Sequence, residues 1–237
     1  MTFPSETPSS STSAVVDAAI TSRRSVRAFL STPVPEAQVR AILQVASRAP
    51  SGSNVQPWKV YVLTGDRLTA LSDAIVAVYN DPDQAAAQSE PYAYYPRQWI
   101  EPYLARRRKV GWDLYGLLGI GKGDKPAMHA QHGRNYRFFD APVGLLFTID
   151  TTMEQGSWLD YGMFLQSIMV AARGRGLDTC PQAAFNGFHE VIRAELALPD
   201  NETFVCGMAL GYADPDAIAN RLTTERAAID DFVTFLS

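Results

Sequence analysis

Three arginines lie within five residues near the start of the chain, at Arg23, Arg24 and Arg27, with Ser25 among them. A guanidinium group presents N–H donors in a planar fork that matches the oxygens of a phosphate or carboxylate, and a neighbouring hydroxyl adds a further donor. The run therefore indicates an anion-binding site at the end of a helix. Taken alone, a solvated basic turn explains the run slightly better.

A second segment of unusual composition covers residues 49–58 and reads APSGSNVQPW. Proline, glycine, serine and asparagine favour turns, so the segment predicts a loop whose backbone N–H groups are free to bind a ligand. Asn54 and Gln56 add amide side chains, and Trp58 adds an aromatic ring. These groups suit a planar heterocycle with carbonyl and ring-nitrogen atoms. An N-capping loop explains the segment equally well.

Common motifs for nucleotide, metal and nucleophile chemistry are missing from the sequence. Residues 119–125 read GIGKGDK, which fits neither a GxGxxG nor a GxxxxGK[ST] motif, so a flexible loop is expected there. His129 and His132 lie three residues apart without a cysteine beside them, and we expect a solvated pair. No GxSxG motif is present, and Cys180 has no histidine near it in the sequence. The sequence therefore supports neither a metal site nor a side-chain nucleophile.

The composition narrows the class of protein. The chain has 237 residues, of which 46% are hydrophobic and 19% charged, and its formal net charge of -4 argues against nucleic-acid binding through phosphate neutralisation. No apolar run approaches the roughly 20 residues of a membrane span. Residues 1–13 lack the apolar core of a secretory signal and are expected to form a disordered tail. Two cysteines are too few for a disulfide framework, which favours a cytoplasmic protein.

Hydrophobic periodicity predicts alternating helices and strands around one core, in the α/β or α+β class, with four or five strands. Helices are expected at 14–22, from 33–36 to before Pro50, at 66–79, 158–173 and 189–196, and strands at 59–63, 143–149, 178–184 and 203–212. The helix at 158–173 is apolar almost all round, which predicts that it is central and buried.

Two further segments do not fit a simple core. Residues 80–139 contain no clear strand, so we expect a helical excursion from the core, such as a lid. Residues 213–237 end in the apolar stretch FVTFL, which has little to pack on within its own segment. Docking on another subunit would bury this tail.

The arginine run and the loop at 49–58, taken together at this spacing, resemble the nitroreductase family of FMN-dependent flavoenzymes. Three later blocks support the resemblance by their order and spacing: DAPV at 140–143, AARGRGLDTCPQAAF at 171–185, and CGMALGYAD with NRLTTER at 206–214 and 220–226. The aromatic middle of the chain and the TCPQAAF block resemble the branch that contains nitrobenzoate reductases. The resemblance covers nearly the whole chain after the N-terminal tail.

The resemblance implies an α+β fold in which helices flank a central, mostly antiparallel sheet. Residues 14–237 would form a single FMN-binding domain. Two subunits would form an intertwined homodimer, with one FMN at each edge of the interface and the tail at 213–237 wrapped around the partner. No nucleic acid, membrane or metal is expected as a partner.

The resemblance also assigns residues to the cofactor. Arg23, Ser25 and Arg27 would bind the phosphate and ribityl chain of FMN, with Arg24 at the ring. The opposite subunit would contribute the loop residues Pro50, Ser51, Gly52 and Asn54, with Gln56 in the same cofactor-binding group. Contacts along the ring are expected from Arg137, at the pyrimidine edge, and from Gln182, Ala183 and Ala184.

The C-terminal block departs from the family pattern. Family members commonly carry an Arg-Thr-x-Arg run where this chain has Thr223 in place of the first arginine. Arg221 and Arg226 remain as candidates for the phosphate, and either of them could instead serve only a salt bridge.

The implied function is an FMN-dependent oxidoreductase that transfers hydride from NADH or NADPH to flavin N5 and then to a nitroaromatic or quinone acceptor, in ping-pong fashion. No side-chain acid or base would be essential, because the flavin carries the redox chemistry. The alternatives are an FMN-binding or storage protein, or a reductive dehalogenase or flavin-cleaving enzyme of the same fold.

Residues of the 80–139 excursion are expected to set acceptor specificity. Trp112 and Tyr115 offer stacking surfaces, and Arg134 or one of the arginines at 106–108 could receive the carboxylate of a nitrobenzoate. The alternative is that the aromatic residues belong to the core and that residues 106–109 form a solvated helix face.

Overall fold

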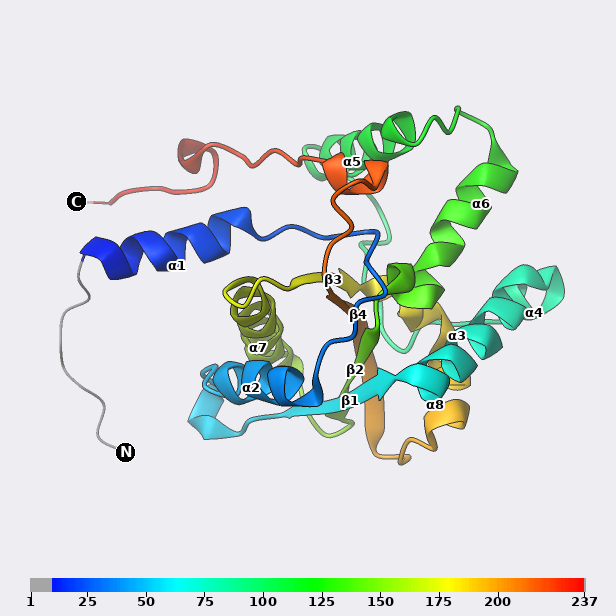
Figure 1. Ribbon diagram of the computed structural model, residues 1–237, viewed down its shortest axis with the longest axis horizontal. Coiled ribbons are helices and arrows are strands. Elements are labelled where there is room, and N and C mark those ends of the chain that lie inside the picture. The colour runs from blue at the N-terminus through cyan, green and yellow to red at the C-terminus, as the bar shows by residue number, and fades with distance from the viewer. Residues whose placement is uncertain (1–9, 237) are drawn as a thin grey trace.

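The computed structural model describes residues 10–236, which form eight helices and four strands with short 3-10 turns between them (Figure 1). The helices are α1 (Ser10–Ser22), α2 (Glu36–Ala46), α3 (Gly65–Asn80), α4 (Pro82–Ala86), α5 (Tyr103–Leu117), α6 (Lys125–Gly133), α7 (Gln155–Arg173) and α8 (His189–Leu196). The strands are β1 (Trp58–Thr64), β2 (Val143–Asp150), β3 (Asp178–Gln182) and β4 (Glu202–Gly211). The 3-10 turns are η1 (Gly52–Asn54), η2 (Arg134–Asp140), η3 (Ala183–Phe188), η4 (Ile218–Arg221) and η5 (Ile229–Asp231).

The strands form one sheet in the order β1-β2-β4-β3, and every neighbouring pair is antiparallel. β2 and β4 occupy the middle of the sheet and are buried on both faces, which explains why their sequences are continuous apolar runs. The expected α+β class with a mostly antiparallel sheet is confirmed.

Two hydrophobic clusters cover the two faces of this sheet. Alternate residues of β2 supply both, because successive side chains of a strand point to opposite faces. Leu145 and Phe147 pack with α2 and α7, whereas Leu146 packs with α3, α8 and η2. Figure 1 shows the two helix pairs on either side of the sheet.

The helix predicted at 158–173 corresponds to α7, but the prediction that it is buried all round is wrong for the single chain. Tyr161, Phe164 and Ile168 pack on the sheet, while Leu159 on the opposite side is 73% exposed. A helix that covers a sheet buries only one stripe of its surface, so the apolar outer side of α7 is left without cover.

Several element boundaries differ from the predictions, and α7, for example, begins at Gln155, three residues before the predicted start. α1 begins at Ser10, four residues before the predicted start at Ala14, so part of the expected tail is helical and its residues 1–9 lie outside the described residues. β3 ends at Gln182 because η3 begins at Ala183.

The segments at 80–139 and beyond Ala213 contribute no strand to the sheet. Residues 80–139 contain α4, α5 and α6 and no strand. Beyond Ala213 the chain has only the short turns η4 and η5, and Phe232, Phe235 and Leu236 are exposed. Within residues 10–236, no helix is long and apolar enough to cross a membrane.

Candidate functional site

The arginine run lines a small pocket together with residues from the far end of the chain, and we call it the arginine pocket. Its lining comprises Arg23, Arg24, Ser25, Arg27, Leu222, Thr224 and Arg226. None of the described residues that line it is acidic. Four guanidinium groups and two hydroxyls therefore surround this space, a set of donors that matches a phosphate.

Hydrogen bonds from two distant segments hold the arginine run in place. Val26 is fully buried, and its N–H donates to the carbonyl of Thr179 on β3 over 3.1 Å. Asn220 of η4 accepts twice, with its carbonyl from Arg24 Nη1 at 2.7 Å and with its side-chain Oδ1 from the N–H of Arg27 at 2.8 Å. The run is thus attached to the sheet on one side and to the C-terminal segment on the other.

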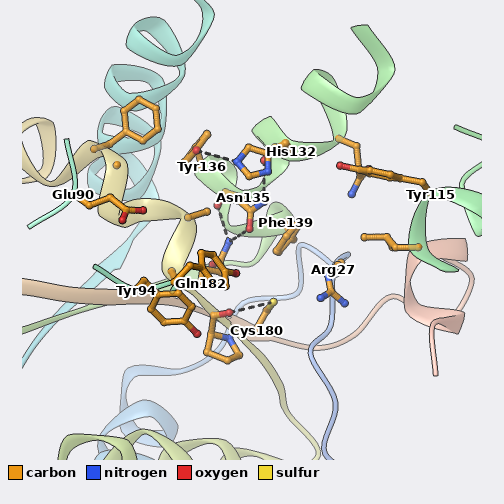
Figure 2. A pocket seen from close by; sticks show the side chains of 18 residues that line it. Arg27, Glu90, Tyr94, Tyr115, His132, Asn135, Tyr136, Phe139, Cys180 and Gln182 are labelled. Atoms are coloured by element: carbon orange, nitrogen blue, oxygen red, sulfur yellow. Dashed lines mark hydrogen bonds between the residues drawn. The ribbon is translucent and has the colours of Figure 1, made fainter. Parts of the chain in front are cut away.

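A larger cavity of about 520 Å³, which we call the main cavity, is shown in Figure 2. Arg27 lines both this cavity and the arginine pocket. Most of the other lining residues come from the end of β3, from η3 and from the 80–139 segment, and they combine aromatic rings with polar groups. They include Tyr94, Tyr95, Tyr115, Tyr136, Phe139 and Phe188 among the aromatic residues, and Glu90, Gln131, His132, Asn135 and Gln182 among the polar ones.

Gln182 is the buried polar residue of this lining. Its Nε2 donates to the carbonyl of Asn135 over 2.8 Å (Figure 2), while its Oε1 is buried with no hydrogen-bond partner within residues 10–236. Buried polar atoms are nearly always paired in folded proteins. A ligand that brings an N–H group to this wall would therefore be stabilised.

The turn that follows Gln182, η3, is held in place by a close contact between the ring of Phe185 and the backbone of Gly207. A Cβ at Gly207 of β4 would lie 2.5 Å from the ring of Phe185, so only glycine fits there. The Phe185 ring is fully buried in this contact. As a result η3 packs closely against β4, and Ala183 and Ala184 form part of the cavity wall.

A third space of about 560 Å³ lies along one face of α5, and we call it the α5 cavity. It shares Arg27, Tyr95, Leu114, Tyr115 and His132 with the main cavity. Trp112 lines this cavity as well. Trp112 and Tyr115 therefore border a ligand-sized space, and their role in acceptor binding stays a prediction.

Two ionisable groups in these walls have shifted pKa values. Burial raises the pKa of the Cys180 thiol to about 11, against the opposing effect of Arg27. Burial, followed by the charge of His129, lowers the pKa of His132. Both groups are therefore uncharged at neutral pH.

The loop at 49–58 does not meet the arginine run within one chain. Its residues Pro50, Ser51, Gly52, Asn54 and Gln56 line neither the arginine pocket nor the main cavity. The loop instead packs on α7, where the N–H of Gly52 donates to Asp160 Oδ2 over 3.0 Å. Its side chains are mostly exposed.

Three arginines expected at the ligand do not line the cavities of the single chain described above. Arg137 pairs with Asp73 of α3 at 2.9 Å, and Arg134 pairs with Asp140 at 2.8 Å. A run of positive φ angles through Phe138, Phe139 and Asp140 turns η2 back on itself and brings that carboxylate to Arg134. Neither Arg134 nor Arg137 lines a described cavity.

Arg221 is the third of these arginines. It lies at the end of η4 and does not line the arginine pocket, whereas Arg226 does. Sequence reasoning missed Asn220 and Asn135, which orient the arginine run and Gln182. Asn220 bonds to Arg27 across 193 positions of the chain, and no local pattern signals such a contact.

Comparisons with known proteins agree with this geometry. A model of the nitroreductase family matches residues 20–212. The chain is 44% identical over 220 residues to a 4-nitrobenzoate reductase of Pseudomonas putida, covering 93% of this chain and 95% of the relative. It is 42% identical over 225 residues to a chloronitrobenzene nitroreductase of Comamonas testosteroni, covering 95% and 98%.

A solved structure has the same fold throughout. The FMN and NADPH-dependent nitroreductase NfnB from Sphigopyxis sp. strain HMH is 39% identical, with a TM-score of 0.89 over 94% of this chain and 99% of that chain. With an arginine pocket joined to a polar, aromatic cavity, and with relatives matched over nearly their whole length, this chain belongs to the nitroreductase family.

Proposed function

We propose that the chain is an FMN-dependent oxidoreductase that uses NADPH or NADH to reduce nitroaromatic acceptors, with quinones as a second acceptor class. The observation that carries the proposal is the position of Arg27, which lines both the arginine pocket and the main cavity. A ligand with a phosphate at one end and a planar, polar ring at the other would fill both spaces. The names of the relatives support the cofactor and the acceptor class.

The residues present fit FMN. Arg23, Ser25 and Arg226 would hold its phosphate in a pocket whose described lining has no acidic side chain. Gln182 offers a buried amide oxygen in need of a donor, which suits an N–H group at the polar edge of the ring. Bound FMN would supply the redox chemistry by accepting hydride from the nicotinamide and passing electrons to the acceptor.

The side chains of the chain itself bind and orient rather than react. The Cys180 thiol stays protonated at neutral pH because burial raises its pKa to about 11, so it is a poor nucleophile. The tyrosines of the main cavity provide flat surfaces on which an aromatic acceptor can stack. In this proposal no side-chain acid or base is essential.

We further propose that the active form is a homodimer, with the loop at 50–56 completing the cofactor site of the partner. In one chain this loop lies apart from the arginine run, and the apolar outer side of α7 and the tail residues Phe232 and Phe235 are uncovered. A groove of about 840 Å³ beside the edge strand β1, lined in part by Val39, Leu43 and Val62, offers the tail of a second copy a place to bind.

One anaerobic experiment tests the proposed function. Protein supplied with FMN should show a flavin absorption band that bleaches on addition of NADPH and returns on addition of 4-nitrobenzoate. Failure to bind FMN would refute the cofactor assignment, and binding without bleaching by either nicotinamide would favour a storage protein. Light scattering tests the dimer, because full-length protein should have twice the mass of one chain and protein lacking residues 227–237 should not.

A further inference from the structure

The α5 cavity has an unusual concentration of positive charge. Arg27, Arg107 and Arg108 line it, and no acidic residue does so in the part of the chain that the structure describes. Its other walls include the aromatic rings of Tyr95, Trp112 and Tyr115. Lys122 Nζ lies 5.7 Å from the ring centroid of Trp112 and adds a further positive charge near this wall.

Helix geometry separates the basic residues of α5 into two groups. Arg108, Trp112 and Tyr115 follow each other at the i, i+4, i+7 spacing that puts side chains on one face of a helix. Lys109 belongs to another face, where it pairs with Asp113 at 2.8 Å and with Glu225 at 3.5 Å. The basic run is therefore not a uniformly solvated face, and one side of it borders a cavity.

The two arginines of α5 that line the cavity differ in their contacts. Arg107 lies over the ring of Trp99, 4.9 Å from its centroid, and 5.9 Å from that of Tyr95, so its guanidinium is already engaged. The side chain of Arg108 forms neither a hydrogen bond nor an ion pair with any residue between 10 and 236. Its five N–H donors are available to a ligand.

The neighbouring main cavity carries a negative charge in its lining, at Glu90, whereas the charged side chains that line the α5 cavity are all arginines. Glu90 lines the main cavity but not the α5 cavity, and the two spaces share Tyr95, Tyr115 and His132 as lining residues. A planar ligand with one anionic group would be repelled at Glu90 and attracted at Arg108. This polarity favours a single orientation for such a ligand.

We propose that the α5 cavity is the subsite for the carboxylate of an anionic nitroaromatic acceptor, with Arg108 as the residue that selects it. Arg107 and Arg27 add positive charge, and Trp112 and Tyr115 flank the ring of the acceptor. This inference rests on the proposed function and narrows it from nitroaromatics in general to carboxylated ones. An anionic oxygen group could also come from the 2′-phosphate of NADPH, and the test below separates the two sources.

The test compares Arg108→Gln with the unmodified protein, both loaded with FMN. The KM for 4-nitrobenzoate should rise at least about tenfold, the loss expected for a charge-assisted hydrogen bond, while the KM for nitrobenzene stays within about twofold. Calorimetric titration of benzoate into the oxidised protein gives a second readout without turnover and should show a similar loss of affinity. Arg108→Lys should recover part of this affinity, because it keeps the charge but loses the fork.

Arg106→Gln is the matched control, since Arg106 lies two residues away on the same helix and lines none of the cavities described above. It should change neither KM. Equal losses for 4-nitrobenzoate and nitrobenzene in Arg108→Gln would overturn the proposal, as would a higher KM for NADPH with an unchanged KM for 4-nitrobenzoate. If the unmodified protein reduces neither acceptor, the proposed function fails, and the benzoate titration still decides whether Arg108 binds a carboxylate.

Discussion

Asn220 holds the backbone of Arg27 from the other end of the chain. The N–H of Arg27 donates to Asn220 Oδ1 over 2.8 Å, and Asn220 Nδ2 donates in turn to the carbonyls of Ala28 at 2.8 Å and Asp214 at 2.9 Å. Asn220 is 5% exposed, so these bonds are sheltered from water. The arginine pocket therefore depends on a side chain that does not itself line it.

We expect Asn220→Ala to weaken FMN binding at least tenfold, because the Arg27 backbone loses its anchor and the carbonyl of Ala28 loses its donor. The same change should lower the free energy of unfolding by about 2–4 kcal/mol, given about 1 kcal/mol for each net hydrogen bond and more for buried groups left unpaired. Flavin fluorescence titration and denaturant unfolding measure the two effects.

Asn201→Ala serves as the control for this variant. Asn201 donates to Asp150 Oδ2 at an exposed position far from the arginine pocket, so its loss should leave FMN binding unchanged. Tight FMN binding by Asn220→Ala would show that the arginine run keeps its shape without the anchor.

The two C-terminal arginines should differ in their effect on the cofactor. Arg226 lines the arginine pocket and Arg221 does not, so Arg226→Gln should weaken FMN binding about tenfold and Arg221→Gln should not. Riboflavin lacks the phosphate, and its affinity should be the same for both variants and the unmodified protein. A parallel loss of riboflavin affinity in Arg226→Gln would contradict a contact between Arg226 and the phosphate.

We expect Glu202 to make the free energy of unfolding depend on pH. Burial alone raises the pKa of its carboxyl, but hydrogen bonds from Thr148, Lys59 and Tyr61 outweigh burial and hold the pKa below its usual 4.5. A carboxyl whose pKa is lowered by folding stabilises the protein above its unfolded pKa, and this contribution is lost as the pH falls through the folded pKa.

Glu202→Gln should therefore be less stable than the unmodified protein at pH 7, by about 1–3 kcal/mol for a buried, charge-assisted network. The difference should shrink as the pH is lowered from 5 toward 3, measured by urea unfolding at each pH. Glu36→Gln is the control, because Glu36 pairs with Arg40 on the surface and such pairs contribute about 0–1 kcal/mol. If the difference in free energy of unfolding between Glu202→Gln and the unmodified protein stays constant with pH, the charge of Glu202 does not stabilise the fold.

Patterns of two kinds could be recognised from the sequence. The strands β1, β2 and β4 are runs of apolar or β-branched residues, and local composition is enough to find them. Arg23, Ser25 and Arg27 lie close together in the sequence, so their shared pocket is also a local property.

The features that were missed depend on contacts between distant segments. Whether Arg137 turns to a ligand or to Asp73 depends on the fold of η2, where Phe138 and Phe139 have positive φ angles that their residue types do not suggest. The buried role of Asn220 depends on the path of the C-terminal segment. The exposed side of α7 was predicted to be core because it carries apolar residues such as Leu159, and local composition does not show which apolar residues the rest of the chain covers.

Complementation between two variants tests the proposed shared site most directly. One chain carries Arg23→Gln with Arg226→Gln in the arginine pocket, and the other carries Asn54→Ala with Gln56→Ala in the loop. In a mixed dimer, one site combines both sets of changes, and the other combines an intact arginine pocket with an intact loop. Co-expressed chains should therefore regain about half of the FMN and of the NADPH-dependent activity per mixed dimer, while each variant alone is deficient. If the loop served the site of its own chain, each site of the mixed dimer would carry one damaged part and nothing would be regained.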